Sequence, residues 1–376
     1  MQDKQHILFQ TEPPAVKLAC GDRRVDIPVL WLRENTEDEQ AVDALTRQRL
    51  FDSHLINPDL ELLAVKSLDS TSAVLTFSDG HSAKYTEAAI LAEIFEHDVY
   101  PQIEAWGSDI DLARVRHDWR EMNDDNAFAA ALESYFRFGF IVLTDVPSTT
   151  EAVLIVGSKF GYVKETNFGK YFEVYSKPMA NDLAYRTVRL GPHTDNPYRD
   201  PVPGIQLLHC LVNETSGGLS TLVDSVRVVD ELQREDLGGC QLLKNTPVRF
   251  RFVDQGVELT CRRPMIHTDD LGNTLGVHYS PRLDSLPLLS QEETTRFHKA
   301  RKRLAELFND PAYELKFRLQ AGELMLFDNS RVLHGRTSYD ASEGHRHLQG
   351  CYIDLDGPRE RYSEIAKRLR KIEEAA

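Results

Sequence analysis

Two histidines and one aspartate are spaced as the ligands of a metal ion would be. His193 and Asp195 stand two residues apart, and His334 follows much later in the chain. In an extended segment, side chains two residues apart point the same way, so His193 and Asp195 are able to reach one ion together. The order His-x-Asp with a distant His is the ligand set of the facial triad, which holds non-haem Fe(II) and leaves coordination positions open. The sequence therefore predicts an Fe(II) centre at these three residues.

Open coordination positions imply that O2 and a co-substrate bind beside the metal. A 2-oxo acid such as 2-oxoglutarate would chelate the ion through its keto-acid end, and its far carboxylate would then need a cation deep in the pocket. Arg346 follows His334 on the run 345–352, and a guanidinium binds a carboxylate with two parallel hydrogen bonds. We therefore predict that Arg346 binds 2-oxoglutarate.

The segments around these residues must position them. Residues 322–328 form an apolar run that predicts a strand, and His334 is expected in the turn after it, from which it reaches back to the metal. A second His-x-Asp pair, His267 and Asp269, stands just before a Gly-Asn pair, which is typical of a hairpin turn between two strands. We interpret this second pair as part of a turn and not as a metal site.

Many short apolar runs with Gly and Pro turns favour a mostly β catalytic domain with flanking helices (α+β), built as a double-stranded β-helix, or jelly roll. The expected strands are residues 139–144, 205–209, 219–223, 248–252, 257–260, 274–278 and 313–317.

Helical spacing and helix-start sequences predict the flanking helices. Residues 126–135 and 358–374 have a helical period. Capping boxes at residues 148–151 and 290–293 predict two further helix starts. In the helix after Ser290, apolar residues share one stripe, which indicates packing against the outside of the roll.

A smaller domain is expected ahead of the catalytic one. Residues 1–95 carry short alternating apolar runs, at 16–20, 26–31, 60–65 and 72–77, which predict a small β-rich N-terminal domain. The catalytic domain is then expected over residues 96–376. A chain of this length is able to bury a core in each.

Composition narrows the class of protein. Apolar residues make up 41% of the chain, as in a soluble globular protein, and no run approaches the length of a membrane span. The first residues do not form a signal peptide, so we expect a cytoplasmic protein. The net charge of -15 argues against a nucleic-acid or anionic-membrane partner, but it would not repel a cationic substrate.

The motifs together resemble the gamma-butyrobetaine dioxygenase family, among the taurine-dioxygenase-like Fe(II)/2-oxoglutarate oxygenases. The resemblance covers roughly residues 100 to 365, and a weaker match extends to the N-terminus. The motifs that carry it are His193-Thr-Asp195, residues 203–210, Gly217 and Gly218 with residues 222–224, residues 328–336 and residues 346–352. It implies Fe(II) as cofactor, 2-oxoglutarate and O2 as co-substrates, and a homodimer.

The resemblance also implies a structural zinc in the N-terminal domain, held by a cysteine cluster and a later histidine. Here the cluster position, residues 34–39, contains no cysteine, and only His81 stands where the histidine would be. One ligand cannot make a closed tetrahedral site. We therefore expect no structural zinc and predict that this charged run is a solvated loop.

A substrate pocket is implied by the same resemblance. An aromatic cage attracts a trimethylammonium group through the faces of its rings, and the matching positions are Phe168, Phe172, Tyr185 and Tyr352, with Tyr171 adjacent.

The anionic end of the substrate is where this sequence departs from its relatives. Asp182 and His278 stand where the resembled enzymes hold a substrate carboxylate with two asparagines, and Arg186 lies nearby in the sequence. An ionised Asp182 would repel a carboxylate, whereas a phosphonate that keeps a proton would donate it. Alternatively, Asp182 points away from the substrate, or it simply binds Arg186 or Arg189.

These residues support one first choice and several alternatives. The first choice is hydroxylation of 2-(trimethylammonio)ethylphosphonate to its 1-hydroxy product. The runner-up is hydroxylation of gamma-butyrobetaine to carnitine, and trimethyllysine is third. An inactive jelly-roll binding protein is the non-enzyme alternative, although His193, Asp195, His334 and Arg346 are all present.

Overall fold

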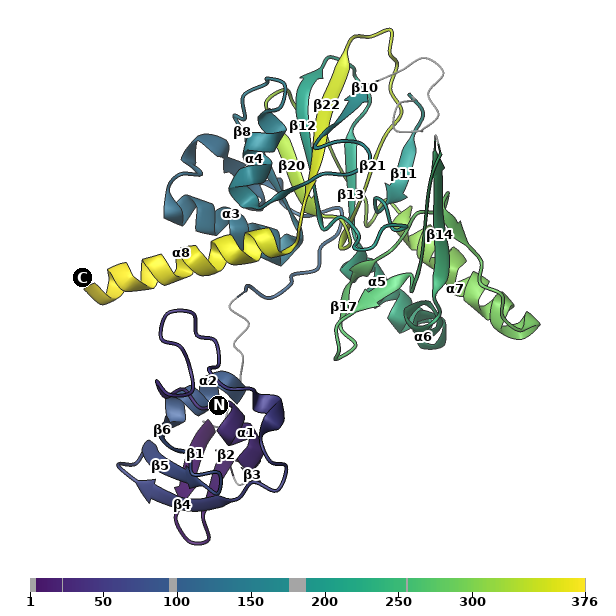
Figure 1. Cartoon of the computed structure of the whole chain (residues 1–376). Coiled ribbons are helices and arrows are strands. Elements are labelled where there is room, and N and C mark those ends of the chain that lie inside the picture. The colour runs from purple at the N-terminus through teal and green to yellow at the C-terminus, as the bar shows by residue number, and fades with distance from the viewer. Residues whose placement is uncertain (1–4, 22, 95–99, 176–186, 255, 376) are drawn as a thin grey trace. The chain divides into compact units, whose positions relative to one another are not determined.

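The computed structural model describes residues 5–21, 23–94, 100–175, 187–254 and 256–375. The chain forms two compact units, residues 1–99 and residues 100–376 (Figure 1). A domain division between residues 95 and 96 stays a prediction, because residues 95–99 lie outside the described part of the chain.

The N-terminal unit contains two three-stranded antiparallel sheets, one with the order β1-β2-β3 and one with the order β4-β5-β6. Buried apolar side chains such as Val16, Leu75 and Phe77 form one core, as the alternation of strand side chains requires. The elements are β1 Gln5–Gln10, β2 Ala15–Cys20, β3 Arg23–Asp26, α1 Val29–Glu34, β4 Leu62–Ser67, β5 Ser72–Phe77, β6 Ser82–Thr86 and α2 Glu87–Ile94.

One predicted strand of this unit is wrong. Strand β3 ends at Asp26, the first residue of the apolar run 26–31, and residues 29–31 of that run belong to the helix α1. Pro28 stands at the N-cap of α1 with φ -58 and ψ 137, and proline is tolerated at a helix start because the first N–H groups have no intrahelical partner there. The apolar run therefore supplies Leu32 and its neighbours to the core from a helix.

A polar network occupies the region where a zinc cluster would stand. Nε2 of His81 lies 3.0 Å from Oδ2 of Asp38, and the hydroxyl of Thr36 donates to the same oxygen at 2.7 Å. Residues 35–39 are a loop, in which Glu37 and Glu39 are exposed but Thr36 is buried. The solvated-loop prediction thus fits the two glutamates, while Thr36 and Asp38 anchor the loop to His81.

The catalytic unit is a jelly roll, as predicted. A seven-stranded sheet has the order β10-β22-β12-β20-β8-β7, with β9 also paired to β22, and a four-stranded sheet has the order β11-β21-β13-β19. A core cluster with side chains from both sheets lies between them. The strands are β7 Arg116–Asp118, β8 Phe140–Thr144, β9 Val163–Lys164, β10 Phe172–Tyr175, β11 Leu190–His193, β12 Ile205–Asn213, β13 Ser220–Asp224, β19 Leu315–Phe317, β20 Leu324–Asp328, β21 Val332–Arg336 and β22 Arg346–Ile353.

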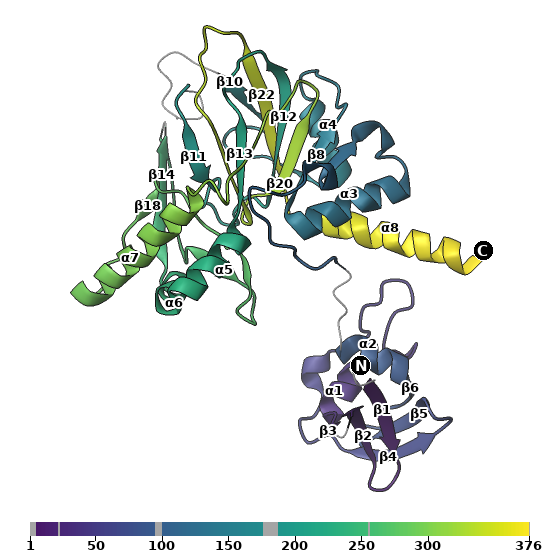
Figure 2. The same cartoon turned by 180° about the vertical axis from the view of Figure 1, so that it is seen from behind.

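Two groups of helices flank the sheets on opposite sides (Figure 2). The first group is α3 Asp125–Phe138, α4 Ala152–Phe160 and α8 Asp356–Ala375, packed against the outer face of the larger sheet. The second group is α5 Ser225–Glu235, α6 Leu237–Asn245 and α7 Gln291–Phe308. This second group packs beside the small sheets formed by β14 Val248–Asp254, β15 Val257–Arg263, β16 Ile266–Thr268, β17 Thr274–Val277 and β18 Asp284–Ser285.

The two capping-box predictions have opposite outcomes. Ser290 and Glu293 form a complete capping box at the start of α7, and Phe297, Leu304 and Leu307 are buried on its inner side, as predicted. The box predicted at residues 148–151 is wrong. Glu151 stands at the N-cap of α4 with a positive φ of 65, and its N–H is bound at 2.7 Å by the side chain of Gln349 from β22.

A buried ion pair joins the four-stranded sheet to α3. Asp224 at the end of β13 and Arg331 before β21 are both buried, with Nη2 and Oδ2 3.2 Å apart. Arg331 also donates to the backbone carbonyls of Arg137, at the end of α3, and of Glu104. Because Arg331 immediately precedes β21, this pair fixes where that strand begins.

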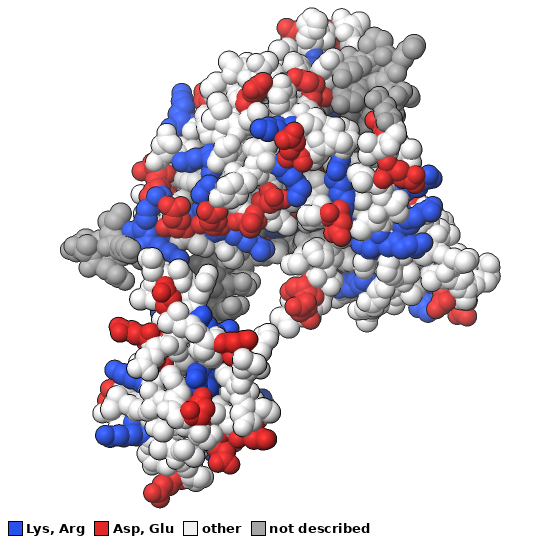
Figure 3. All heavy atoms as spheres, in the orientation of Figure 1, with Lys and Arg blue, Asp and Glu red and all other residues white. Residues whose placement is uncertain are grey.

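The surface carries mixed charge. On the face seen in Figure 3, acidic and basic side chains of the catalytic unit are interspersed and form no large field of one sign. Within the described residues, no helix combines the length and the apolar content that a membrane crossing requires.

Candidate metal centre

His193 and His334 are neighbours on two paired strands. β11 and β21 are antiparallel, and their register sets His193 directly opposite His334. The two rings have centroids 4.3 Å apart. The prediction that His334 lies in a turn is wrong, because β21 pairs with β11 on one side and with β13 on the other and so carries His334 within a sheet.

Asp195 completes a cluster of three ligand atoms. One ligand atom each of His193, Asp195 and His334 lies within 4.8 Å of the other two. Nε2 of His193 is 3.4 Å and Nε2 of His334 is 3.9 Å from Oδ1 of Asp195. The structure therefore brings together the three residues that the sequence analysis selected.

The protonation of the two histidines suits a metal ion. Nδ1 of His193 lies 3.0 Å from the carbonyl oxygen of Gly191, which assigns the ring proton to Nδ1 and leaves a lone pair on Nε2. Burial and the neighbouring His193 lower the pKa of His334 to about 3, so His334 is neutral at neutral pH. Burial alone would raise the pKa of Asp195, but His334, His193 and a hydrogen bond from Tyr352 hold it well below its ordinary value. A neutral His334 beside the Asp195 carboxylate is the state that binds a divalent cation.

Two residues outside the triad hold Asp195. The Tyr352 hydroxyl donates to Oδ2 at 2.7 Å, which leaves Oδ1 towards the histidines. The fully buried Asn329 side chain accepts from the Asp195 N–H at 2.7 Å and donates to the Asp195 carbonyl at 2.9 Å. The sequence analysis gave Asn329 no role, although its place directly after a predicted strand and before the second histidine was a signal.

Arg346 enters the roll from the start of β22. Side chains alternate along this strand, so Arg346, Leu348 and Tyr352 share the inner face, and Leu348 belongs to the core between the sheets. Arg346 is 8% exposed, and its Nε and Nη1 are buried without a hydrogen-bond partner in the described part of the chain. Burial and the nearby Arg336 lower its pKa to about 10, so it is still a cation at neutral pH.

The predicted cage residues are only partly brought together. The rings of Phe172 and Tyr352 lie 5.3 Å apart, and Phe172 covers Gly350 on the neighbouring strand. The ring of Phe168 instead lies 5.9 Å from the guanidinium of Arg199.

The remaining predicted pocket residues are Tyr171, Asp182, Tyr185, Arg186 and His278. Tyr171 packs on the outer core cluster, and its hydroxyl donates to Glu151 at 3.4 Å. Three further predicted pocket residues, Asp182, Tyr185 and Arg186, lie outside the described residues.

His278 lies close to the candidate ligands along the backbone. Its neighbour Tyr279 accepts a hydrogen bond from the N–H of Thr194, between the first two ligands. Nδ1 of His278 is 3.0 Å from the carbonyl oxygen of Pro264, so Nδ1 carries the proton and Nε2 is an acceptor. Burial lowers the pKa of His278 to about 4, and the ring is neutral at neutral pH.

The second His-x-Asp pair forms a hairpin, as predicted. β16 and β17 are antiparallel partners, and Gly272 between them has a positive φ of 86. The Asp269 carboxylate accepts hydrogen bonds from the backbone of Leu271 and Asn273, and these contacts close the turn.

The residues present fit the group that the pattern implies. The three clustered atoms are two imidazole nitrogens and one carboxylate oxygen, and no Lys or Arg ion pair to Asp195 occurs among the described residues. This donor set is that of the facial triad for Fe(II). The unpartnered cation of Arg346 on the inner face of the same roll matches the far carboxylate of a chelating 2-oxo acid.

Comparison with known proteins agrees with this arrangement. Residues 100–352 match the family described as "Taurine catabolism dioxygenase TauD, TfdA family". The chain is 32% identical to gamma-butyrobetaine dioxygenase of Pseudomonas sp. (strain AK-1), over 91% of both chains. It is 29% identical to gamma-butyrobetaine dioxygenase of Homo sapiens over 88% of both chains, and 26% identical to mitochondrial trimethyllysine dioxygenase of Gallus gallus over 93% of this chain and 85% of that one.

Proposed function

Because the chain belongs to the TauD, TfdA family of dioxygenases, we propose that it hydroxylates a small trimethylammonium compound at the centre formed by His193, Asp195 and His334. It is a dioxygenase with Fe(II) as its cofactor and 2-oxoglutarate and O2 as its co-substrates. When bound, the iron supplies the activation of O2 that the side chains themselves lack. The observation that carries the proposal is the cluster of three ligand atoms together with Arg346 on the inner face of the same roll, whose Nε and Nη1 have no hydrogen-bond partner among the described residues.

The chain's own residues bind the metal and hold its ligands in the right orientation. The contact of His193 Nδ1 with the Gly191 carbonyl leaves Nε2 to face Asp195, and Tyr352 and Asn329 hold Asp195 in place. Each of these contacts exists before any ligand arrives. Phe327, a residue of the core between the two sheets, has its ring 5.0 Å from that of His334 and gives the site an apolar wall on that side.

Gamma-butyrobetaine is the substrate that the relatives favour. The Pseudomonas and human relatives both carry its name, with identity of 32% and 29% over most of each chain. The sequence alone favoured the phosphonate, so this order reverses the first choice. We propose that Phe172 and Tyr352 supply two faces of the cage for the trimethylammonium group.

One observation keeps 2-(trimethylammonio)ethylphosphonate as the second candidate. Neutral His278, with its proton on Nδ1, offers only an acceptor at Nε2. A carboxylate also offers only acceptors, whereas a phosphonate with one remaining proton donates a hydrogen bond. This chemistry favours the phosphonate wherever His278 contacts the anionic end. Asp182 and Arg186 stay predictions for that end.

The test is a panel of substrates. Purified protein with Fe(II) and 2-oxoglutarate is given gamma-butyrobetaine, 2-(trimethylammonio)ethylphosphonate and trimethyllysine, and succinate and hydroxylated product are measured. Product from gamma-butyrobetaine in step with succinate supports the first candidate. The variant His278→Asn should shift the turnover ratio towards gamma-butyrobetaine if His278 selects the phosphonate. A protein that binds no iron and releases no succinate with any of the three is the inactive binding protein, and the proposal fails.

The homodimer stays a prediction drawn from the family. Light scattering on the purified protein measures its mass in solution, and a mass of one chain would contradict it.

A further inference from the structure

A tyrosine that has no assigned role, Tyr339, lies beside Arg346. Tyr339 is 8% exposed, and its ring lies 5.0 Å from the guanidinium carbon of Arg336 and 5.5 Å from that of Arg346. Its hydroxyl is buried and has no hydrogen-bond partner among the described residues. A buried phenol without a partner is costly, so its presence calls for an explanation.

Among the described residues none accepts a hydrogen bond from the Tyr339 hydroxyl, and the two groups that contact its ring are the guanidinium groups of Arg336 and Arg346. The two guanidinium groups next to it have only N–H donors, and they cannot accept the phenol proton. Arg346 likewise leaves Nε and Nη1 without an acceptor within the described chain. A single carboxylate would satisfy both residues, because each of its oxygens accepts more than one hydrogen bond.

Two glycines, Gly217 and Gly218, allow Tyr339 and Arg346 to lie close together. A Cβ on Gly218, which has a positive φ of 65, would lie 2.9 Å from Nε of Arg346. A Cβ on Gly217 would lie 2.4 Å from the carbonyl oxygen of Ser338, next to Tyr339. Gly218 N–H donates to that same carbonyl at 3.0 Å. Only residues without a side chain let this turn press Tyr339 and Arg346 together.

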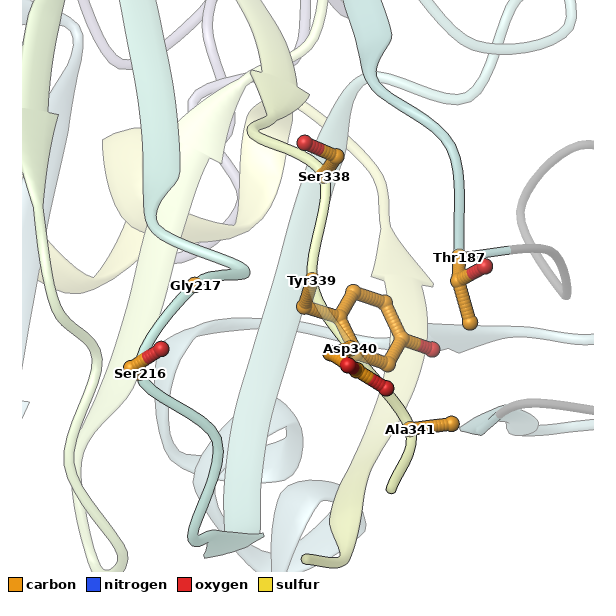
Figure 4. Close-up of a pocket in the computed structure, with 7 residues that line it drawn as sticks. All are labelled: Thr187, Ser216, Gly217, Ser338, Tyr339, Asp340 and Ala341. Carbon is orange, nitrogen blue, oxygen red and sulfur yellow. The ribbon is translucent and has the colours of Figure 1, made fainter. Parts of the chain in front are cut away.

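Behind Tyr339 lies a pocket of about 600 Å³. In Figure 4 the Tyr339 ring lies between the segment of Gly217 and the segment of Thr187. Tyr339 lines this pocket, but Arg336 and Arg346 do not. Tyr339 therefore borders both the pocket and the two guanidinium groups that contact its ring.

We propose that Tyr339 fixes the length of the co-substrate: its hydroxyl donates to the distal carboxylate that Arg346 binds, and its ring closes that end of the site. The inference rests on the proposed function, because it takes a 2-oxo diacid to be the co-substrate. It predicts that the site accepts 2-oxoglutarate and rejects the diacid longer by one methylene, 2-oxoadipate, for want of space. Without the ring, the pocket lined by Thr187 and Ser216 becomes available to the longer acid.

The experiment measures binding and not turnover. Dissociation constants of 2-oxoglutarate and 2-oxoadipate are measured by calorimetry on the protein loaded with Mn(II). We expect Tyr339→Phe to weaken 2-oxoglutarate binding about tenfold, as the loss of one hydrogen bond to a charged group does. Tyr339→Ala should in addition reduce the preference for 2-oxoglutarate over 2-oxoadipate at least about tenfold. The exposed Tyr162 gives the matched control, Tyr162→Phe, which should bind both acids as the unaltered protein does.

The outcomes separate this inference from the proposed function. If the unaltered protein binds neither acid while it holds the metal, the proposed function itself is wrong and this inference with it. If the unaltered protein binds 2-oxoglutarate but Tyr339→Phe binds it equally well, only the role of Tyr339 is overturned. Should Tyr339→Ala fail to fold, judged by its circular dichroism, the Tyr339→Phe result alone decides.

Discussion

Two histidine–aspartate pairs in this chain have nearly the same geometry and opposite surroundings. In the N-terminal unit, Nε2 of His81 lies 3.0 Å from Asp38, and in the catalytic unit, Nε2 of His193 lies 3.4 Å from Asp195. The exposed fractions are also alike, 12% and 23% for the first pair and 7% and 22% for the second. Distance and burial therefore do not distinguish the two pairs.

The third group distinguishes them. Beside Asp38 stands the hydroxyl of Thr36, which donates a proton and completes a hydrogen-bond network. Beside Asp195 stands His334, a neutral imidazole. The first arrangement satisfies its own atoms, whereas the second gathers lone pairs that require a cation. A pair becomes a metal centre only when the fold adds a further unprotonated ligand.

The largest effect is expected from matched alanine variants of the two aspartates. Asp195→Ala should abolish turnover and iron binding, because it removes a ligand from the centre. Asp38→Ala should keep the iron content and turnover of the unaltered protein. Iron by metal analysis and succinate release measure both. Full activity in Asp195→Ala would show that the centre lies elsewhere.

A smaller effect is expected when the hydroxyl that holds Asp195 is removed. Tyr352→Phe keeps the ring that faces Phe172 but deletes the hydrogen bond to Asp195. We expect iron affinity to fall about tenfold, the size typical of a lost partner of a metal ligand. The Michaelis constant for the trimethylammonium substrate should change little. A large rise in that constant with unchanged iron affinity would mean that the hydroxyl serves the substrate.

The network in the N-terminal unit should contribute stability only. Asp38→Asn should lower the local stability by about 1 kcal/mol, because the pair is partly exposed. Burial raises the pKa of Asp38, but Thr36, the Gln40 N–H and His81 together lower it. A carboxyl with a lowered pKa stabilises the folded state above its unfolded pKa of about 4, and this contribution is lost as the pH falls through the folded value. The difference between variant and unaltered protein should therefore shrink in acid.

Hydrogen exchange of the β5 and β6 amides in the full chain measures this difference. An unchanged protection at neutral pH would mean that the network contributes nothing.

The smallest effect is expected at the second His-x-Asp pair. His267→Ala should leave iron binding unchanged, since Asp269 is committed to its own turn. Loss of iron from this variant, measured as for Asp195→Ala, would contradict the hairpin interpretation.

Local sequence patterns predicted the structure correctly where residues close in sequence determine it. The box of Ser290 and Glu293 is complete within four residues, and it formed as predicted. His193 and Asp195 are close in sequence, and the apolar pattern placed His334 near a strand.

Long-range contacts account for what the sequence did not reveal. Glu151 has its N–H bound by Gln349, a residue of a distant strand, and so the box predicted there did not form. The hydrogen bonds between Asn329 and Asp195 join residues that are 134 positions apart in the chain. No local sequence pattern predicts such a contact. Tyr339 is close in sequence to Arg336 and Arg346, but no local pattern indicates that both guanidinium groups contact its ring.

The pairing of β11 with β21 also sets an order of events during synthesis. β11 is the edge strand of its sheet, and β21 is its partner. A ribosome delivers residue 193 long before residue 334, so a nascent chain displays β11 with an unpaired edge and only two of the three ligands. The three-ligand centre therefore forms only after residue 334 has been made. A chain truncated before that residue lacks one ligand of the centre.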